Sequence, residues 1–516
     1  MSKNLKNIGV VSGLTVVSRV LGLFRDALSA AVFGATALNS AFVTAFRIPN
    51  LFRRLLGEGS LTAAFIPTLQ HELHGKGREA AYRLVNEVAS WIFLVSIALV
   101  AVGMLAFANA RILSGHEERW YLSADLSVYL FPYLIFVCLA AVYGATLNVM
   151  QRFTESAMSP VLLNISMIVT LGGAGLHWAS TPMGEMQWLC GGVLVGGVMQ
   201  MLLPAAALYR RGWRPKFLLS WSPGVREIAR LMAPGLWGAA IYQVNLVVIQ
   251  LLAMSLNDSA ASLLFYAGRI TELPIGVFAI AVSTVVYPLI AEHAAKGDFR
   301  SMASDYLRGM RMILVINVPA AAGLALLSVP IVRVLFQRGH FSAQDTHFLA
   351  PLITLSVLGL PFFSVVSLTT RAFYALKDTA TPVRIATLSF FVNLGGSLLL
   401  MHWLGTAGLV IASTAAVVIQ CVLLQILLSR RVPEILMSTL APDLLKIFVG
   451  ALAMSALVGA CWWGWLEGRG LRADLIALVV LIPAGTLLYG AVLWVAKIGG
   501  REEFAALFEK LLSRLR

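Results

Sequence analysis

Arginine side chains inside apolar segments have the clearest potential for chemistry in this sequence. An arginine at the centre of a membrane helix costs about 2.5 to 3.5 kcal/mol, so each one requires a wet cavity or a polar partner. The planar guanidinium donates two parallel hydrogen bonds to a phosphate and stays charged at physiological pH, so a pyrophosphate suits a cluster of arginines. The arginines in or close to apolar stretches are Arg19, Arg25, Arg47, Arg53, Arg54, Arg269 and Arg371.

Too few acids accompany these arginines to neutralise them. Residues at i, i+3, i+4 and i+7 share a helical face. The pairs that meet this condition are Arg19 with Asp26, Arg54 with Glu58, and Arg269 with Glu272. The remaining positive charge favours an anionic ligand. The alternative is that an arginine reaches the aqueous interface or ties helices together, and we expect this structural role for Arg47 and Arg371.

The elements that must hold these arginines are membrane-spanning helices. Of 516 residues, 59% are hydrophobic and 12% charged, whereas an ordinary soluble chain has roughly 25% charged residues. Several apolar stretches reach the roughly 20 residues that span the hydrocarbon. We predict an all-α polytopic membrane protein with about fourteen transmembrane helices. Their ranges are 8–33, 38–70 (broken near Pro49 and Gly57), 82–110, 122–150, 158–178, 187–208, 228–256, 260–292, 310–330, 346–375, 381–402, 407–428, 446–466 and 474–496.

Lysine and arginine alternate between the predicted loops, as the positive-inside rule requires. They are dense in the tails and in one set of loops, for example 210–216 and 430–431, whereas the alternate loops hold few. This pattern predicts that both termini are cytoplasmic. Most of the net charge of +14 is then orientation signal that also attracts anionic membrane lipids. We therefore expect membrane lipids, and no nucleic acid, as partners of these basic residues.

An internal repeat at a separation of roughly 220 residues indicates two similar halves. Arg47 followed by Ile48 and AAFIPTLQHELHGKG corresponds to Arg269 followed by Ile270 and STVVYPLIAEHAAKG. Both copies place basic loops on the same side of the membrane, so the repeat is parallel. The predicted organisation is two pseudo-symmetric six-helix lobes followed by two further helices. The ranges are 1–222 for the N-terminal lobe, 223–432 for the C-terminal lobe, 433–500 for the additional helices and 501–516 for a cytoplasmic amphipathic tail.

No motif for covalent or metal chemistry accompanies the helices. The four cysteines lie in separate apolar segments, the histidines lack metal-ligand spacing, and no Ser/His/Asp, Cys/His or Walker-type arrangement occurs. We therefore expect no metal, no cofactor and no catalytic residue, and a transporter rather than an enzyme. Intramembrane amides such as Asn164, Gln250 and Asn393 are expected to hydrogen-bond between helices.

Several segments resemble the MurJ/MviN family of lipid II flippases. They are SRVLGLFRDALSAAVFGA at 18–35, FRIPNLFRRLLGEGSLTAAFIP at 46–67, FPYLIFVCLAAVYGATLNVMQRF at 131–153, SPVLLNISM at 159–167 and FYAGRITELPIGV at 265–277. The resemblance covers nearly the full chain and implies the multidrug/oligosaccharidyl-lipid/polysaccharide exporter fold. It also implies a protein of the bacterial inner membrane that moves undecaprenyl-pyrophosphate-linked peptidoglycan precursor, lipid II, to the periplasmic leaflet by alternating access without ATP hydrolysis.

The resemblance implies roles for individual residues. Family cavity arginines fall on Arg19, Arg25 and Arg269, with Arg53 as a further functional arginine near the cytoplasmic gate, and we expect these four to bind the pyrophosphate. Together with the acid–base pairs above, the cavity or gate residues to expect are Ser18, Asp26, Asn50, Arg54, Glu58, Ser262 and Glu272.

Two positions depart from the family pattern. Ser40 and Gly268 stand where relatives often have an acid, so gate salt bridges are not expected there. Some members bind sodium through a carboxylate on the seventh helix, but 232–256 contains no acid in this chain. We therefore expect no sodium site, and the driving force to come from the membrane potential or another ion acting on the charged cavity.

Other functions stay open from the residues alone. Within transport, the alternatives are an exporter of another polyprenyl-linked glycan and a drug or ion antiporter. From other classes come a structural partner of envelope-assembly proteins and a membrane-embedded glycosyltransferase. A pump for cationic drugs should present acids, a scaffold needs no buried basic cavity, and a transferase needs a base or metal-binding acids. The arginine surplus favours a pyrophosphate lipid without distinguishing lipid II from another.

Overall fold

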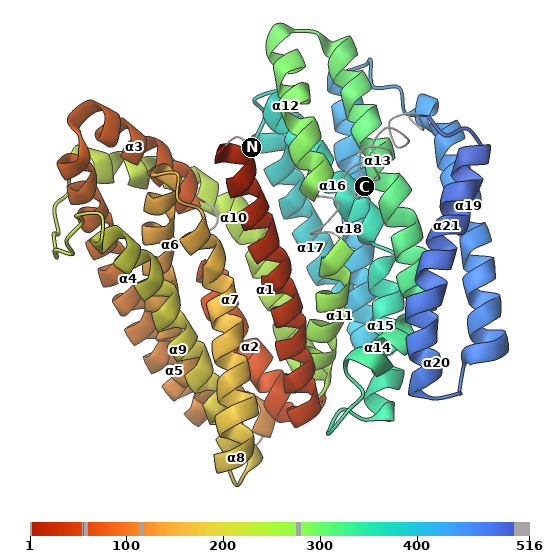
Figure 1. Ribbon diagram of the computed structural model, residues 1–516, viewed down its shortest axis with the longest axis horizontal. Helices are drawn as coiled ribbons and strands as arrows, with labels where there is room; N and C mark the ends of the chain where they lie inside the picture. The colour runs from red at the N-terminus through yellow and green to blue at the C-terminus, as the bar shows by residue number, and fades with distance from the viewer. Residues whose placement is uncertain (1–2, 54, 56–59, 114–116, 275–279, 500–516) are drawn as a thin grey trace. The chain divides into compact units, whose positions relative to one another are not determined.

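Helices make up every regular element in the described part of the chain (Figure 1). The computed structural model describes residues 3–53, 55, 60–113, 117–274 and 280–499. Within these ranges nine helices are long and apolar enough to cross a membrane, and one bent pair makes up to ten. The prediction of an all-α multi-pass membrane protein is confirmed.

The count of about fourteen spans is not confirmed by length and composition. Helical segments lie in every predicted range, but several are interrupted by charge or proline and are too short or too polar to pass alone. The second predicted span, for example, is divided into two helices that each contain a proline, Pro49 and Pro67. Both helices continue through their prolines, and Gly57, near which the other break was expected, lies outside the described residues.

The first of two compact units contains the residues up to Ser262 together with Arg338–Phe341. Its core is built from large side chains with almost no exposed surface, among them Phe65, Leu126 and Tyr133. Its helices are α1 (Lys3–Phe33), α2 (Ala37–Phe52), α3 (Ser60–Lys76), α4 (Arg78–Leu113), α5 (Glu118–Leu130), α6 (Tyr133–Val149), α7 (Thr154–Val169), α8 (Leu176–Trp178), α9 (Pro182–Tyr209) and α10 (Pro223–Leu256).

The second unit contains Leu263–Gln337 and the chain from Ser342 onward. Tyr306, fully buried, anchors a core shared by α12, α13, α16 and α18 and binds Thr369 and Gln425 through its hydroxyl. The helices are α11 (Ala260–Pro274), α12 (Ile280–Lys296), α13 (Phe299–Leu326), α14 (Ser328–Leu335), α15 (Ala343–Val357), α16 (Leu360–Ala375), α17 (Ala380–Leu404), α18 (Thr406–Arg431), α19 (Ala441–Cys461), α20 (Leu471–Ile476) and α21 (Ile482–Val495).

The seventh predicted span, α10, packs against α2 and α3 and belongs to the first unit. Sequence symmetry had placed it in the second lobe, beginning at residue 223. The predicted lobe limits of 1–222, 223–432 and 433–500 stay predictions, and the tail at 501–516 lies outside the described residues.

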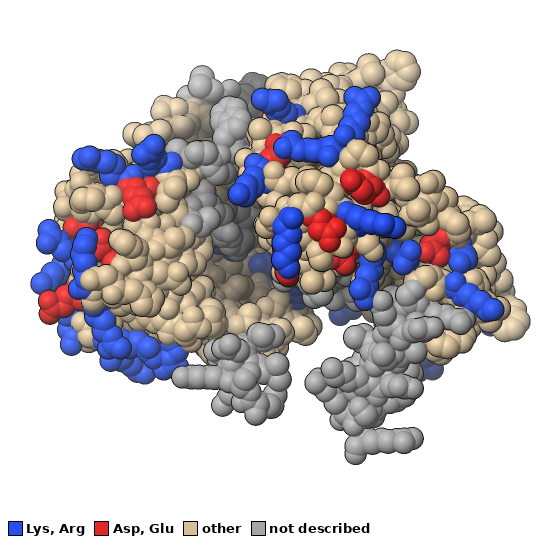
Figure 2. Space-filling view, turned by 90° about the horizontal axis from the view of Figure 1, so that it is seen from above, with Lys and Arg blue, Asp and Glu red and all other residues tan. Residues whose placement is uncertain are grey.

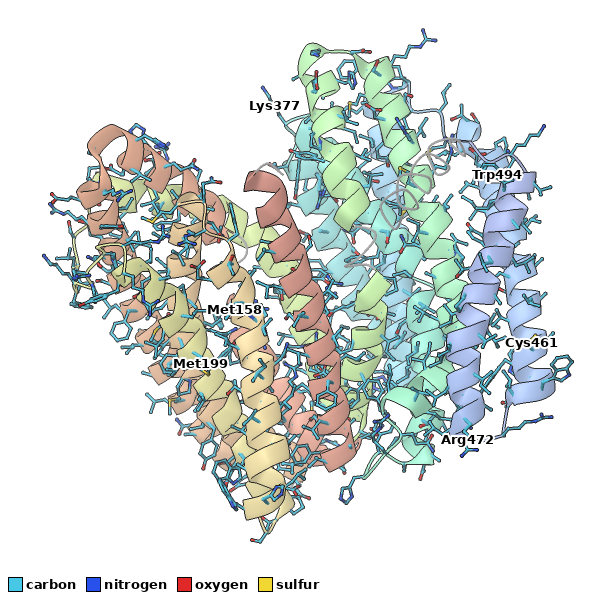
Figure 3. All side chains as sticks on the ribbon, viewed as in Figure 1. Met158, Met199, Lys377, Cys461, Arg472 and Trp494 are labelled. Carbon is cyan, nitrogen blue, oxygen red and sulfur yellow. The ribbon has the colours of Figure 1, made fainter. Side chains whose placement is uncertain are left out.

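Basic side chains are frequent on the surface drawn in Figure 2, with fewer acids among them. In Figure 3, Lys377, from the predicted cytoplasmic loops, and Arg472, from the alternate loops, lie at opposite ends of the second unit. These two residues therefore lie as the charge pattern predicts, whereas the separation of the remaining loops and the orientation in a membrane stay predictions.

The turn between α16 and α17 is closed by Asp378, whose carboxylate accepts bonds from the Thr381 N–H (3.0 Å) and hydroxyl (2.8 Å) and from Arg431 (2.6 Å). Burial alone would raise the pKa of Asp378, but these donors outweigh it and lower the pKa. A lowered pKa stabilises the fold above the carboxyl's unfolded value, and this stability is lost as the pH falls through the folded value.

Replacing Asp378 with asparagine should therefore lower the stability of the folded protein by about 1 kcal/mol at neutral pH, because the partner arginine is half-exposed and the pair is partly screened. The difference from wild type should begin to shrink below about pH 4. It should close only as the pH falls through the lowered pKa of the folded Asp378 carboxyl. Thermal unfolding of wild type and Asp378→Asn in detergent, from neutral to acidic pH, measures this difference in stability. Glu434→Gln, at an exposed acid of the same unit, should show no such difference, and an Asp378→Asn effect that does not vary with pH would contradict the charge-based explanation.

Candidate functional site

Arg19 stands out in α1 as a half-buried cation that has no hydrogen bond or ion pair within the described ranges. The neighbouring Ser18 carbonyl accepts a 3.0 Å bond from the Asn164 amide on α7, which fixes this turn of α1. An unpaired arginine in an apolar helix is costly. Arg19 is thus the predicted site residue whose geometry most favours an external anion.

Arg25, in contrast, is fully engaged inside the first unit. Its Nε and Nη2 donate to Asp26 Oδ1 at 2.9 and 2.6 Å, and Nη1 donates to Asn164 Oδ1 at 3.1 Å. Arg25 and Asp26 are 5% and 3% exposed. The carboxylate predicted to face Arg19 along one helical face is therefore bonded to the adjacent arginine, and the network ties α1 to α7.

Arg53 follows α2 and donates from Nε to Asn50 Oδ1 at 3.2 Å, while the Asn50 amide donates to the Phe46 carbonyl at 3.2 Å. Asn50 thus links the last turn of α2 to the guanidinium. Arg54 and Glu58, the other predicted residues of this region, lie outside the described residues.

A cavity of about 320 Å³ opens beside Arg53 within the first unit. Small residues of α6 line one wall, and polar side chains of α6, α7 and α9 face the same space: Asn148, Ser156, Ser159 and Gln200. Asn148 Oδ1 is buried without a hydrogen bond to any described residue. Sequence reasoning missed this cavity, because its polar residues are spread singly over three apolar helices.

Arg47 has the structural role that its position predicted. Its Nη1 donates to the Leu246 carbonyl and to Gln250 Oε1, both at 3.1 Å. Gln250, 2% exposed, donates in turn to Thr44 Oγ1 and the Ala261 carbonyl, both at 3.1 Å. These bonds fasten α10 to α2, and they confirm the interhelical role expected for Gln250. Asn164 and Asn393 also bond between helices, the latter to Ser413 on α18.

Replacing Gln250 with leucine should destabilise the first unit by about 2 to 3 kcal/mol, because buried groups on three neighbouring residues lose a partner. Thermal unfolding of the purified protein measures this. Gln243→Leu, on the same helix, is the matched control, since Gln243 makes no hydrogen bond within the described ranges. Equal stability of the two variants would contradict a structural role for the Gln250 bonds.

The Ser40 hydroxyl fixes the first turn of α11. Ser40 Oγ donates to the Asp258 carbonyl at 2.5 Å and accepts from the Ser262 N–H at 3.2 Å. Both serines have no exposed surface. The first turn of α11 is therefore held by a neutral side chain.

Segment 338–341 packs on the end of α1. The His340 N–H donates to the Ala31 carbonyl at 2.7 Å. Gly34 and Gly339 both have left-handed backbones (φ 62° and 58°), and a Cβ on either would collide with a carbonyl of the other segment. Only glycine permits this close approach.

Arg269 lies on α11 in the second unit. It is paired with Glu272 at 3.5 Å, as the i, i+3 spacing predicted, and lies over the Phe265 ring at 5.2 Å. The Glu272 side chain is about half exposed (52%), so the pair is weak and can exchange partners. A Cβ on Gly268 would meet nothing within 4 Å, so this position has room for a larger side chain.

The structure therefore brings Arg25, Asp26 and Ser18 together through Asn164, and Arg53 together with Asn50. Arg269 and Glu272 form a separate pair in the second unit. Whether the arginines of both units contact one ligand stays a prediction.

The helical arrangement is that of known transporters. The structure resembles one solved as an inward-facing multidrug resistance MATE family transporter of the MOP superfamily, with a TM-score of 0.68 and 14% identity over 83% of this chain and 98% of the other. An outward-facing structure of such a transporter gives a TM-score of 0.56 at 16% identity, covering 83% of this chain and 96% of the other. The chain thus has the fold of a polytopic transporter of this superfamily.

Comparison with related sequences identifies the family to which this transporter-like chain is similar. The profile of the family described as "Lipid II flippase MurJ" matches residues 29–479. A "Probable lipid II flippase MurJ" of Bdellovibrio bacteriovorus is 32% identical over 505 residues, covering 94% of each chain, and that of Haemophilus influenzae is 33% identical, covering 93% of this chain and 97% of its own. The solved "Lipid II flippase MurJ, inward closed conformation" gives a TM-score of 0.78 at 24% identity over 96% of this chain and 99% of its own.

The chain belongs to the MurJ lipid II flippase family. Membership confirms both the resemblance drawn from the sequence and the prediction of a transporter rather than an enzyme.

Proposed function

We propose that this protein is a lipid II flippase of peptidoglycan biosynthesis. Its substrate is undecaprenyl-pyrophosphate-linked disaccharide-pentapeptide, which it moves from the cytoplasmic to the periplasmic leaflet of the bacterial inner membrane. Family membership over most of the chain supports the substrate, and the observation that carries the mechanism is Arg19, a half-buried cation without a partner among the described residues.

The pyrophosphate is bound by Arg19 first and by Arg269 from the other half of the repeat. The Arg269–Glu272 pair is 3.5 Å long and its carboxylate is about half exposed, so a doubly charged ligand competes with Glu272 for the guanidinium. Arg25 also binds the pyrophosphate, once the pyrophosphate has replaced Asp26 as the partner of the Arg25 guanidinium. Arg53, held by Asn50, contacts the substrate at the cytoplasmic entrance, with Arg54 and Glu58 beside it in the gate.

Transport proceeds by alternating access. The similar fold of MATE transporters in inward- and outward-facing states supports two conformations for this helical arrangement. Ser18, Asn50, Ser262 and Glu272 line the cavity or gate between these states. Both termini are cytoplasmic, consistent with the dense basic loops at one end of the helices.

No cofactor is required in this proposal. A cavity that carries several positive charges responds to the membrane potential, since one charge that crosses 100 mV changes the free energy by about 2.3 kcal/mol. The potential, or an ion that follows it, therefore resets the cavity after release of the substrate.

Depletion of the protein tests the proposed substrate directly. In cells that lose it, lipid II should accumulate in the cytoplasmic leaflet, and a membrane-impermeant reagent added to spheroplasts should label less of it. Re-expression of the wild-type chain should restore the labelling. Unchanged labelling after depletion would assign the protein to another polyprenyl-linked glycan.

A further inference from the structure

The connection between α9 and α10 is an extended segment strapped along α4, and we call residues 210–221 the strap. It is the yellow-green irregular segment that follows α9 in Figure 1. Three residues of α4 at i, i+4 and i+8 bind its main chain on one helical face. The bonds are Tyr82 hydroxyl to the Arg211 carbonyl (3.0 Å), Asn86 amide to the Arg214 carbonyl (3.0 Å), and the Leu218 N–H to Ser90 Oγ (2.9 Å).

Aromatic residues fix both ends of the strap. The Trp213 indole, 3% exposed, donates to Asn86 Oδ1 at 2.9 Å, and the Trp91 indole donates to the Ser220 carbonyl at 3.1 Å. Trp91 also meets the Trp221 ring edge-on, with ring centres 5.4 Å apart. The strap is therefore a fixed surface feature, whose side chains keep definite directions.

The exposed apolar residues and the basic residues occupy different parts of the strap. Phe217, Leu219 and Trp221 alternate along the extended chain and are 62%, 46% and 52% exposed. The residues before them are basic: Arg210, Arg211, Arg214 and Lys216. Between Tyr82 and Trp91 α4 rises about 13 Å, which exceeds the roughly 5 to 8 Å of head groups on each side of the hydrocarbon. The strap therefore reaches from the aqueous edge of the interface to the acyl chains.

The apolar face of the strap continues a lipid-facing surface. Just beyond Trp91, Leu94, Val95 and Ile97 of α4 are 41%, 47% and 39% exposed. This predicted span has the highest mean hydropathy of those found in the described ranges, 2.5, so its exposed residues face acyl chains. A water-soluble partner would leave part of this joined apolar surface uncovered, whereas a lipid covers all of it.

The basic end is arranged for a phosphate. Arg214 is held by a 2.9 Å bond from Nη1 to the Tyr209 carbonyl, and its guanidinium lies 3.9 Å over the Tyr209 ring. The backbone N–H of Lys216 donates to Asn86 Oδ1 at 3.3 Å. The Lys216 side chain is exposed, and its ammonium makes no hydrogen bond or ion pair with a described residue. One positioned guanidinium and one free ammonium thus stand above an apolar stripe, in the order in which a phospholipid presents its phosphate and acyl chains.

We propose that the strap binds the phosphate of anionic phospholipids from the adjacent leaflet, with Arg214 and Lys216 on the head group and Phe217, Leu219 and Trp221 among the acyl chains. This site is separate from the arginines assigned to the transported substrate and does not depend on the proposed transport function.

Lipid binding to the full-length protein in detergent, measured by native mass spectrometry with phosphatidylglycerol or phosphatidylcholine, tests the proposal. Each basic residue near a lipid surface contributes about fivefold in affinity. Lys216→Gln, which keeps every main-chain bond of the strap, should weaken phosphatidylglycerol binding about fivefold, and Arg214→Gln/Lys216→Gln about 25-fold. Phosphatidylcholine binding should change little. The matched control is Arg300→Gln/Arg430→Gln, at two exposed arginines whose side chains make no hydrogen bond or ion pair in the described ranges, and it should bind as wild type.

Two results would overturn the proposal. One is wild-type affinity of the double strap variant for phosphatidylglycerol, which would leave a protein as the occupant of this face. The other is displacement of the lipid by millimolar inorganic phosphate, which would show that the strap binds free anions instead of a phospholipid. In nanodiscs, lipids brominated on the acyl chains should quench wild-type tryptophan fluorescence more than that of Trp221→Phe, and equal quenching would place Trp221 away from the acyl chains.

Discussion

The Arg19→Ala variant is expected to fail to sustain growth of a bacterium depleted of its own lipid II flippase. The substrate pyrophosphate would lose a partner in a site of low polarity, and removal of one member of such a desolvated charge pair costs about 2 to 5 kcal/mol. Transport should therefore fall at least about 30-fold. Because Arg19 makes no bond within the described part of the chain, the variant should insert and fold normally.

Arg371→Ala is the matched control for that experiment. Arg371 is also a half-buried arginine without a hydrogen bond or ion pair in the described ranges. It lies one turn from the C-terminal end of α16, at Ala375, so we assign it to the aqueous interface. Cells that carry Arg371→Ala should grow, and normal growth with Arg19→Ala at wild-type protein levels would contradict the role of Arg19.

The second large effect is expected at Asp26. The Asp26→Ala variant leaves the Arg25 guanidinium buried with only neutral partners, Asn164 Oδ1 and Met167 Sδ, among the described residues. An uncompensated buried charge costs about 3 to 5 kcal/mol. The protein should unfold at a lower temperature in detergent and accumulate poorly in membranes. Removal of both charges, in Arg25→Met/Asp26→Leu, should restore stability, because apolar residues of similar volume replace a buried pair at little cost.

The double variant also separates the two roles of Arg25. If Arg25 exchanges Asp26 for the pyrophosphate, Arg25→Met/Asp26→Leu should be stable and unable to complement. A stable double variant that supports growth would limit Arg25 to tying α1 to α7. A double variant as unstable as Asp26→Ala would instead contradict the pairing seen between the two side chains.

Spacing along one helix predicted part of this site. The Arg269–Glu272 pair is present because both residues lie on α11, one turn apart. The expected face shared by Arg19 and Asp26 failed to give a contact, because Arg25 folds back onto its neighbour and its remaining nitrogen reaches Asn164 on α7. A helical wheel contains no information on the second helix, so it cannot choose between the two arginines.

The fold class followed from composition, since the apolar content leaves few alternatives to membrane helices. Pro49 alone does not predict where α2 ends, because the helix continues past it to Phe52. The cavity beside Arg53 was not predictable, because Asn148 and Gln200 become neighbours only when α6 and α9 pack. The basic residues of the strap predict a loop, but not its binding to α4. That binding depends on Asn86 and Ser90, isolated polar residues within an apolar helix.

Translocation by the purified protein tests the central claim most directly. The wild-type chain, reconstituted into proteoliposomes with labelled lipid II in one leaflet, should move the label to the other leaflet when a membrane potential is imposed. Arg371→Ala should match it, and Arg19→Ala should transport at the rate of empty liposomes. Equal transport by wild type and Arg19→Ala would contradict a pyrophosphate site built on Arg19, and no transport by the wild type with the potential applied would contradict the proposed function itself.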